Sequence, residues 1–162
     1  MNLSEQLGII NRHMEKAPVD VFGMANELGL NCHFAYLEDE ISGMLEKVSE
    51  DSYRVTANAS HPKTRQRFTV AHEIGHYILH RKLIGDGVDD NRAYRSTELG
   101  KYHNTAIGPK QETEANKFAA SVLMPIALIR GELAEDPTII ADILAHKFEV
   151  SKMAMQIRMS NL

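Results

Sequence analysis

The N-terminal part of the chain has the spacing of apolar residues that is typical of two amphipathic helices. Helical spacing covers residues 4–16, with Ser4 as the expected N-cap, and then residues 18–28. Gly29 follows directly and is expected to end the second helix, because glycine readily adopts the left-handed conformation that closes many helices. The chain is therefore predicted to begin with two helices.

A run of short apolar segments follows and predicts three strands, over residues 31–37, 41–48 and 53–57. The acidic residues 38–40 join the first two segments, and Gly43 inside the second is expected to mark a bulge. A small three-stranded antiparallel sheet fits this order.

Two longer segments with helical periodicity lie in the middle of the chain. The first is predicted over residues 62–80, with Pro62 at or near its first turn, and the second over 110–124, where Pro125 ends it. Between them, residues 81–110 are polar, irregular and interrupted by four glycines. We expect this segment to be either a wall or lid over a cleft, or an exposed surface loop.

The C-terminal part is predicted to be helical, over residues 126–134, 138–148 and 151–159. The last two helices resemble a helix-turn-helix, because a short turn separates them and Ser151 is placed to cap the second. That second helix has few polar side chains with which to read DNA. We therefore expect a helical hairpin that packs on the core or binds a partner protein.

These elements together predict an α+β fold with a helical core, a small sheet and a C-terminal helical hairpin. The expected division is a core domain over residues 1–125 and a C-terminal helical subdomain over 126–162. With 162 residues, 43% of them hydrophobic, the chain is long enough for one sizeable core, although a small appended subdomain also fits.

Composition and charge restrict the cellular setting. Cys32 is the only cysteine, so an internal disulfide is excluded, and neither a leader nor a long apolar run is apparent. We expect a cytoplasmic protein that does not engage a membrane. A formal net charge of −4 gives no basic surface overall, so direct nucleic-acid binding is not expected.

Residues 72–76 carry the most informative chemistry, the pattern H-E-x-x-H within a predicted helix. His72 and His76 project from one face of that helix and can share a divalent ion, while Glu73 can reach a water on the ion. Apolar residues surround the pattern on most sides, and buried His and Glu side chains need a partner such as Zn²⁺. The pattern predicts a zinc hydrolase.

A third ligand must come from outside this pattern. A metzincin would continue with a glycine and a further histidine, but Leu79 and Lys82 stand at those positions and exclude that class. His80 lies ~12 Å along the helix from His72, which is too far for all three histidines to bind one ion. His80 is expected to be a helix C-terminal histidine, favoured there by the helix dipole.

The helix predicted over 110–124 is the better source of the third ligand. On a helical wheel, Glu112 lies nearer the middle of its apolar face than Glu114 does, so Glu112 is the carboxylate expected to point inward. Both glutamates also suit the N-terminus of a helix, where they would stabilise its dipole. Asn116 follows Glu112 by one turn and is spaced to orient a metal-bound histidine or the carboxylate.

Two blocks of sequence, RFTVAHEIGHYILH and, about thirty residues later, ETEANKFAASVLMP, are similar to the ImmA/IrrE family of bacterial and phage metallopeptidases. This gluzincin-like family implies a zinc site with two histidines and one glutamate as ligands, an asparagine behind them and a second glutamate as catalytic carboxylate. In this chain these are His72, His76, Glu112, Asn116 and Glu73. Family members with two glutamates before the alanine keep Glu114 as an alternative ligand.

The resemblance also implies a substrate and a reaction. The substrate would be a helix-turn-helix transcriptional repressor, whose cleavage by a zinc endopeptidase relieves repression. In metal-assisted hydrolysis Glu73 would take a proton from the attacking water and pass it to the leaving amine. A donor such as Tyr102 or His103 would help to hold the oxyanion.

Two other functions stay open from the sequence. One is a DNA-binding or partner-binding regulator with little or no proteolysis. The other is the toxin of a two-gene toxin–antitoxin module. Glu73 argues against a catalytically inactive scaffold, which would have no use for an acid beside the metal ligands.

Overall fold

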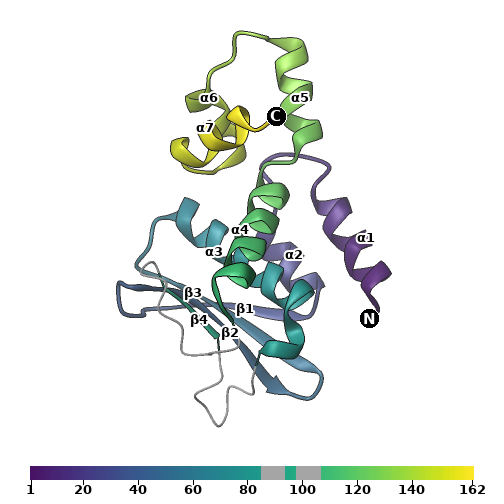
Figure 1. Cartoon of the computed structure of the whole chain (residues 1–162), viewed down its shortest axis with the longest axis vertical. Helices are drawn as coiled ribbons and strands as arrows, with labels where there is room; N and C mark the ends of the chain where they lie inside the picture. Colours follow the sequence, from purple (N-terminus) through teal and green to yellow (C-terminus); the bar gives the residue numbers. More distant parts are fainter. Residues whose placement is uncertain (85–93, 98–106) are drawn as a thin grey trace.

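The computed structural model describes residues 1–84 and 107–162 in full and the backbone of residues 94–97. A sheet lies at one end of the molecule and three C-terminal helices lie at the other end (Figure 1). Helices α3 (Lys63–Leu79) and α4 (Pro109–Leu123) cross the middle of the molecule, between the sheet and these helices. The fold is of the α+β class, as predicted.

The sheet differs from the predicted one in pairing and in strand number. It has four strands in the order β1-β3-β2-β4, with β1 parallel to β3, and with β2 antiparallel to both β3 and β4. Their bounds are β1 Leu30–Ala35, β2 Ile41–Ser49, β3 Ser52–Asn58 and β4 Tyr94–Thr97. The predicted three-stranded antiparallel sheet is therefore wrong in detail: the sheet is mixed, and β4 comes from the segment predicted to be irregular.

The side chain of Asn58 explains why the first two strands do not form a hairpin. It is fully buried at the end of β3, where its amide nitrogen donates to the carbonyl oxygens of Glu38 at 3.1 Å and Ile41 at 2.9 Å. Its oxygen accepts from the backbone N–H of Leu37 at 3.3 Å. These bonds hold the connection between β1 and β2 across the end of β3, so that β1 lies beside β3.

The N-terminal helices are α1 (Leu3–His13) and α2 (Val21–Glu27). Asn2, and not the predicted Ser4, caps α1, because its side chain accepts from the backbone N–H of Glu5 at 2.9 Å. Asp20 caps α2, which begins three residues later than predicted. Gly29 has the left-handed φ of +86° expected of a residue that follows a helix.

Helix α3 is the centre of the molecule and is buried on nearly all sides between Arg67 and Tyr77. It lies on β2 and β3, with α2 and α4 against its other faces. Val70 and Ile74 are completely buried, and burial of such side chains contributes about 1.5–3 kcal/mol each. The apolar surroundings predicted for the H-E-x-x-H pattern are therefore confirmed.

Two glycines allow this close packing. A Cβ at Gly43 would lie 2.5 Å from Thr69 Cγ2 on α3, and the pairing of β2 with β4 shifts by one residue between Ile41 and Gly43, as the predicted bulge requires. At Gly75 a Cβ would lie 3.1 Å from the Phe118 ring and 3.3 Å from the Ala115 Cα, both on α4.

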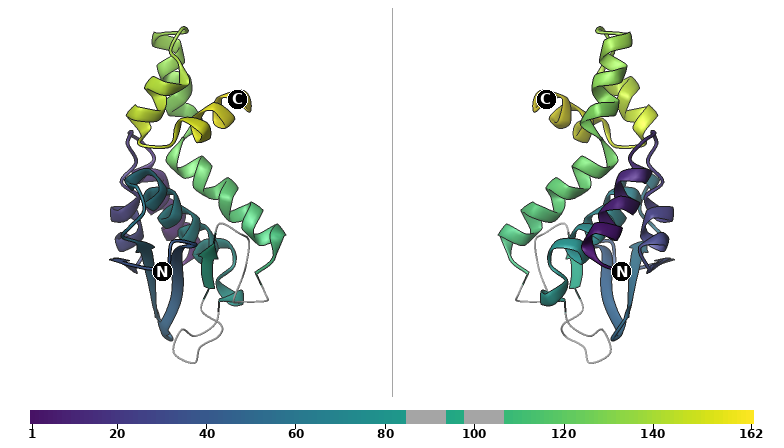
Figure 2. Two further views of the ribbon diagram at one scale, coloured as in Figure 1. Left: turned by 90° about the vertical axis from the view of Figure 1, so that its left-hand side faces the viewer. Right: turned by 90° about the vertical axis from the view of Figure 1, so that its right-hand side faces the viewer.

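The C-terminal helices follow α4 directly. They are α5 (Ile126–Glu135), α6 (Ala141–Phe148) and α7 (Lys152–Ser160), and a short 3-10 helix, η1 (Arg81–Leu83), follows α3. The turn between α6 and α7 passes through Glu149 at φ +53°, and the Ser151 side chain caps α7. Two side views show α4 running from the level of the sheet to these helices (Figure 2). A separate C-terminal subdomain stays a prediction.

Arg67 joins α3 to the turn between α6 and α7. The residue is 3% exposed, and its Nε donates to the carbonyl oxygen of Glu149 at 3.1 Å. Among the described helices, none is long and apolar enough to cross a membrane.

Candidate metal centre

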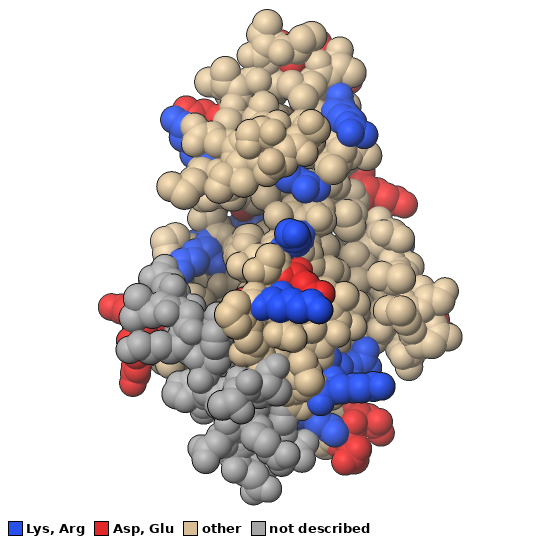
Figure 3. Space-filling model, viewed as in Figure 1, with Lys and Arg blue, Asp and Glu red and all other residues tan. Residues whose placement is uncertain are grey.

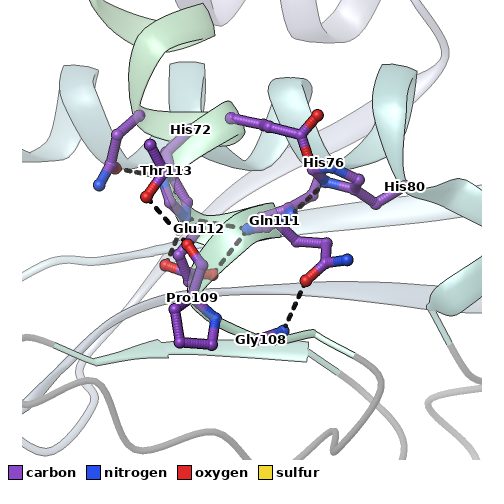
Figure 4. A network of polar contacts seen from close by, with 10 residues as sticks. His72, His76, His80, Gly108, Pro109, Gln111, Glu112 and Thr113 are labelled. Atoms are coloured by element: carbon purple, nitrogen blue, oxygen red, sulfur yellow. Dashed lines mark hydrogen bonds and ion pairs between the residues drawn. The ribbon is translucent and has the colours of Figure 1, made fainter.

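Helices α3 and α4 bring two imidazoles and one carboxylate to a common point. His72 Nε2 and His76 Nε2 are 3.0 Å apart, and the Glu112 oxygens lie 3.3 Å from His72 Nε2 and 2.9 Å from His76 Nε2. In the close view the Glu112 carboxylate faces both rings (Figure 4). The side chains predicted as ligands from the sequence therefore meet in space.

The arrangement suits a metal ion. All of the ligand atoms lie within 4.8 Å of one another, in the only group of this kind among the residues described. Atoms bound to one tetrahedral ion at about 2.0–2.2 Å would be about 3.3–3.6 Å apart. The observed distances are slightly shorter than this, so a small outward movement of each side chain would accommodate an ion.

The start of α4 fixes the position of Glu112. Gly108 precedes the helix and Pro109 is its first residue, while the Gln111 side chain accepts from the Gly108 N–H at 2.9 Å. Pro109 suits the first turn because its missing N–H would have no helical partner there. Glu112 thus lies in the first turn, where the helix dipole favours a carboxylate.

Burial sets the protonation of the two histidines. Burial lowers the pKa of His76 to about 4, against an opposing effect of its hydrogen bond with Glu112. Burial also acts to lower the pKa of His72, but the hydrogen bond with Glu112 and the charge of Glu73 outweigh it, so the pKa is raised. His76 is therefore neutral at pH 7, as a metal ligand must be.

Asn116 lies where the sequence predicted an orienting side chain. Its Oδ1 is 2.8 Å from His72 Nδ1, and an amide oxygen can only accept a hydrogen bond. The proton of neutral His72 is then on Nδ1, which leaves the Nε2 lone pair directed toward His76 and Glu112. Asn116 selects the tautomer of His72 that can bind a metal.

His80 selects the tautomer of His76 in the same way. This contact was not predicted from the sequence. His80 Nδ1 lies 2.9 Å from His76 Nδ1, and His80 Nε2 lies 3.3 Å from the Glu114 carboxylate. If a metal were bound at His76 Nε2, the proton of His76 would be on Nδ1 and would be donated to His80 Nδ1, and His80 Nε2 would donate to Glu114. Glu114, the alternative third ligand, is thus placed beside His80 and not beside the two Nε2 atoms.

A signal for this contact was present in the sequence. His80 follows His76 by four residues, as His76 follows His72, so the three rings lie along one face of α3. His80 is 7% exposed at the C-cap of α3. Its placement at the helix end was predicted, but its burial against α4 was not.

Glu73 follows His72 directly and is completely buried. Its position beside the metal ligands suits a carboxylate that exchanges protons with a water at the centre. The proposed oxyanion donors, Tyr102 and His103, lie outside the described residues, as does most of the segment 81–110.

A cleft opens beside the centre. It has a volume of about 1110 Å³ and extends from His72 and Glu112 along α4 to α7. This is larger than the usual pocket for a small molecule, about 300–1,000 Å³, so the cleft can take a segment of polypeptide.

The chain matches one known protein family. The family model for the IrrE N-terminal-like domain, Peptidase_M78, matches residues 25–160, which include both helices of the centre and all three C-terminal helices. No protein of curated function matches the chain. The family model thus covers every residue of the candidate centre.

Proposed function

The chain belongs to the IrrE N-terminal-like family of metallopeptidases, and on this premise we propose that it is a zinc-dependent endopeptidase that cleaves a helix-turn-helix transcriptional repressor. One observation carries the proposal: His72, His76 and Glu112 converge, and Glu73, next to His72 in the sequence, is completely buried. The repressor as substrate is supported by the likeness of the two motif blocks to ImmA/IrrE peptidases. Its cleavage would relieve repression.

Zinc is the proposed metal because of the donor set. Two imidazoles and one carboxylate are a common ligand set of catalytic zinc, which keeps a fourth position open. When bound, zinc polarises the scissile carbonyl and lowers the pKa of a water at that position. Asn116 and His80 orient the two imidazoles from behind.

The proposed role of Glu73 is to move one proton. Its carboxylate takes a proton from the water as the water oxygen bonds to the carbonyl carbon of the substrate. It then gives that proton to the amide nitrogen as the carbon–nitrogen bond breaks, so that the products are an amine and a carboxylic acid, which ionises at neutral pH. Complete burial keeps bulk water away from this carboxylate and strengthens its electrostatic interactions.

The test is the Glu73→Gln variant. We expect kcat for cleavage of a repressor encoded beside the gene to fall about 10²–10⁴-fold while zinc stays bound, because Gln cannot accept the proton. Mass spectrometry maps the cut, and elemental analysis measures zinc. The matched control, Glu135→Gln, changes an exposed glutamate on α5 and should leave kcat unchanged.

Cleavage by Glu73→Gln at the rate of the unchanged protein would contradict the mechanism. If no repressor is cut and a gel shift shows tight, salt-sensitive binding to upstream DNA, the DNA-binding alternative replaces the proposal. If the protein neither cleaves a repressor nor binds DNA, and instead halts growth unless a neighbouring gene is expressed, the toxin alternative replaces the proposal.

A further inference from the structure

The far end of the cleft is built by α7, which places the C-terminal helices beside the metal centre. We call this the α7 cleft. It is lined by Asn116 and Lys117 of α4 and by Met124 directly after α4, and its α7 wall includes Met153, Ile157 and Arg158. A polypeptide that reaches the centre through the cleft therefore passes along α7.

Apolar side chains of α7 are exposed within this cleft. Met153 is 70% exposed and Ile157 is 57% exposed, and Phe68 of α3 lies on the same cleft. Large apolar side chains that stay exposed side by side mark a binding surface more often than scattered ones do. Because they line the cleft, they suit apolar side chains of a segment that lies in it.

The cleft also has a distinct charge. Glu112 is the only acidic residue among those described that line it, and its carboxylate faces the two imidazoles. Three described cations also line the cleft: Arg65, Lys117 and Arg158. Within the described part of the chain, Lys117 and Arg158 form no ion pair with a carboxylate. In the view of Figure 3, Lys and Arg side chains lie across the middle of the molecule, with an acidic side chain among them.

Arg158 is the more informative of the two. Its Nε donates to the Met124 carbonyl oxygen at 3.0 Å, which holds the guanidinium at the junction of α4 and α7. Partial burial lowers the pKa of Arg158, which indicates that the charge is partly removed from water. A partly buried guanidinium is well placed to form bidentate hydrogen bonds with a carboxylate.

We propose that the α7 cleft selects substrate segments in which an acidic side chain meets Arg158 and Lys117 and neighbouring apolar side chains pack on Met153 and Ile157. The proposal rests on the proposed function for the identity of that segment as a substrate. Phosphate groups of nucleic acid could also meet these cations, but the exposed apolar side chains that line the same cleft favour polypeptide.

Binding to the zinc-loaded Glu73→Gln protein tests the proposal without hydrolysis. The probes are three fluorescein-labelled pools of random dodecapeptides of Leu, Phe, Ala and Ser with Glu, Gln or Lys, and the readout is fluorescence anisotropy. We expect the Glu pool to bind about tenfold more tightly than the Lys pool. Arg158→Gln and Lys117→Gln should each reduce that preference about three- to tenfold.

Matched variants separate the cleft from general surface effects. Arg130→Gln removes an exposed arginine of α5 outside the cleft, and should leave the preference unchanged. Ile157→Ser should weaken binding of all pools about threefold or more, while Ile143→Ser, at a similarly exposed position on α6, should not. Arg158→Lys keeps the charge and should keep most of the preference even if Arg158→Gln disturbs α7.

Equal binding of the three pools, or an equal effect of Arg130→Gln and Lys117→Gln, would overturn the proposal. So would binding of a DNA duplex that is tighter than that of the Glu pool and is lost in Arg158→Gln. If repressors are cleaved but the pools bind alike, this inference fails alone. If the preference for Glu is found and no repressor is cleaved, the proposed function fails and the binding preference of the cleft stands.

Discussion

At the scale of single residues, each imidazole of the candidate centre is held through both of its ring nitrogens. His72 Nδ1 contacts Asn116 and His76 Nδ1 contacts His80, while both Nε2 atoms face Glu112. An imidazole that is held through Nδ1 loses little further conformational freedom when a metal binds at Nε2. The contacts behind the rings should therefore contribute to metal affinity as well as to stability.

The contact from His80 can be tested by its effect on metal binding. His80→Phe keeps an aromatic ring but removes the acceptor for His76 Nδ1–H, so we expect zinc affinity to fall about 10–100-fold. His80→Asn restores an acceptor near the former Nδ1 and should recover part of the loss. Competition with a chelating dye measures affinity.

Glu114→Gln should affect zinc affinity less than the changes at His80 do. The Glu114 side chain is 44% exposed, so loss of its charge should reduce zinc affinity only a few fold. A purely structural role for His80 would lower the melting temperature of the metal-free protein without changing zinc affinity, and that result would contradict the orienting role.

The pKa values of the two histidines predict how metal binding depends on pH. His76 has a pKa of about 4 and is already neutral, whereas His72 has a raised pKa and is protonated at mildly acid pH. Zinc must displace that proton, so affinity should rise with pH, about tenfold per unit, until the pKa of His72 is passed.

Calorimetry in two buffers with different ionisation enthalpies measures this proton directly. Near pH 6 we expect about one proton to be released for each zinc bound. If no proton were released at pH 6, His72 would be neutral without the metal, contrary to its raised pKa. Release of two would mean that His76 is also protonated.

At the scale of secondary structure, the packing of α3 on α4 determines whether Glu112 reaches the imidazoles. Gly75 and Phe118 lie at this contact, where an added Cβ would be 3.1 Å from the Phe118 ring. Replacement of Gly75 by Ala favours helix by about 1 kcal/mol, but overpacking typically costs about 1–3 kcal/mol. The steric cost should prevail, because the nearest atoms include the α4 backbone.

We therefore expect Gly75→Ala to destabilise the protein by up to about 2 kcal/mol and to weaken zinc binding, because α4 must move away from α3. Gly131→Ala is the matched control, since nothing lies within 4 Å of its added Cβ on α5, and it should stabilise by up to about 1 kcal/mol. Thermal unfolding and chelator competition measure the two effects. A stabilised Gly75→Ala with unchanged zinc affinity would contradict this account.

The same contact shows how far the sequence could predict the site. Spacing within one helix was enough to indicate that His72 and His76 share a face and that Glu112 points inward, since helical geometry fixes both. The pairing of His80 with Glu114 depends on how two helices cross, which no single-helix pattern contains. For that reason His80 was assigned only to a helix end.

The sheet was predicted less well for a similar reason. Alternating residues located three strands to within a few positions, but pairing depends on partners that are distant in sequence. Two features were not visible in that pattern: the hydrogen bonds of Asn58 that hold the β1–β2 connection, and the pairing of β4 with β2. Local pattern therefore gave the elements but not their order in the sheet.

At the scale of the whole molecule, buried apolar side chains and specific hydrogen bonds join the C-terminal helices to the core, and the α7 cleft depends on that junction. Arg67 is the main polar link from α3. It donates to the carbonyl oxygens of Glu149 at 3.1 Å and Phe148 at 3.4 Å, and it is almost completely buried. A change at Arg67 should thus affect α6 and α7 more than the sheet.

We expect Arg67→Met to destabilise the junction by about 2–4 kcal/mol, because one buried and one partly buried carbonyl group lose a charged donor. Hydrogen exchange should quicken first in residues 141–160, and less in β1 to β3, if the C-terminal helices open separately as the predicted subdomain would. Lys63→Gln is the control, since that exposed lysine also meets Glu149, at 3.6 Å, and a surface pair contributes at most about 1 kcal/mol. An equal increase in exchange across the whole chain would show that core and C-terminal helices unfold together, and the division at residue 125 would then be wrong.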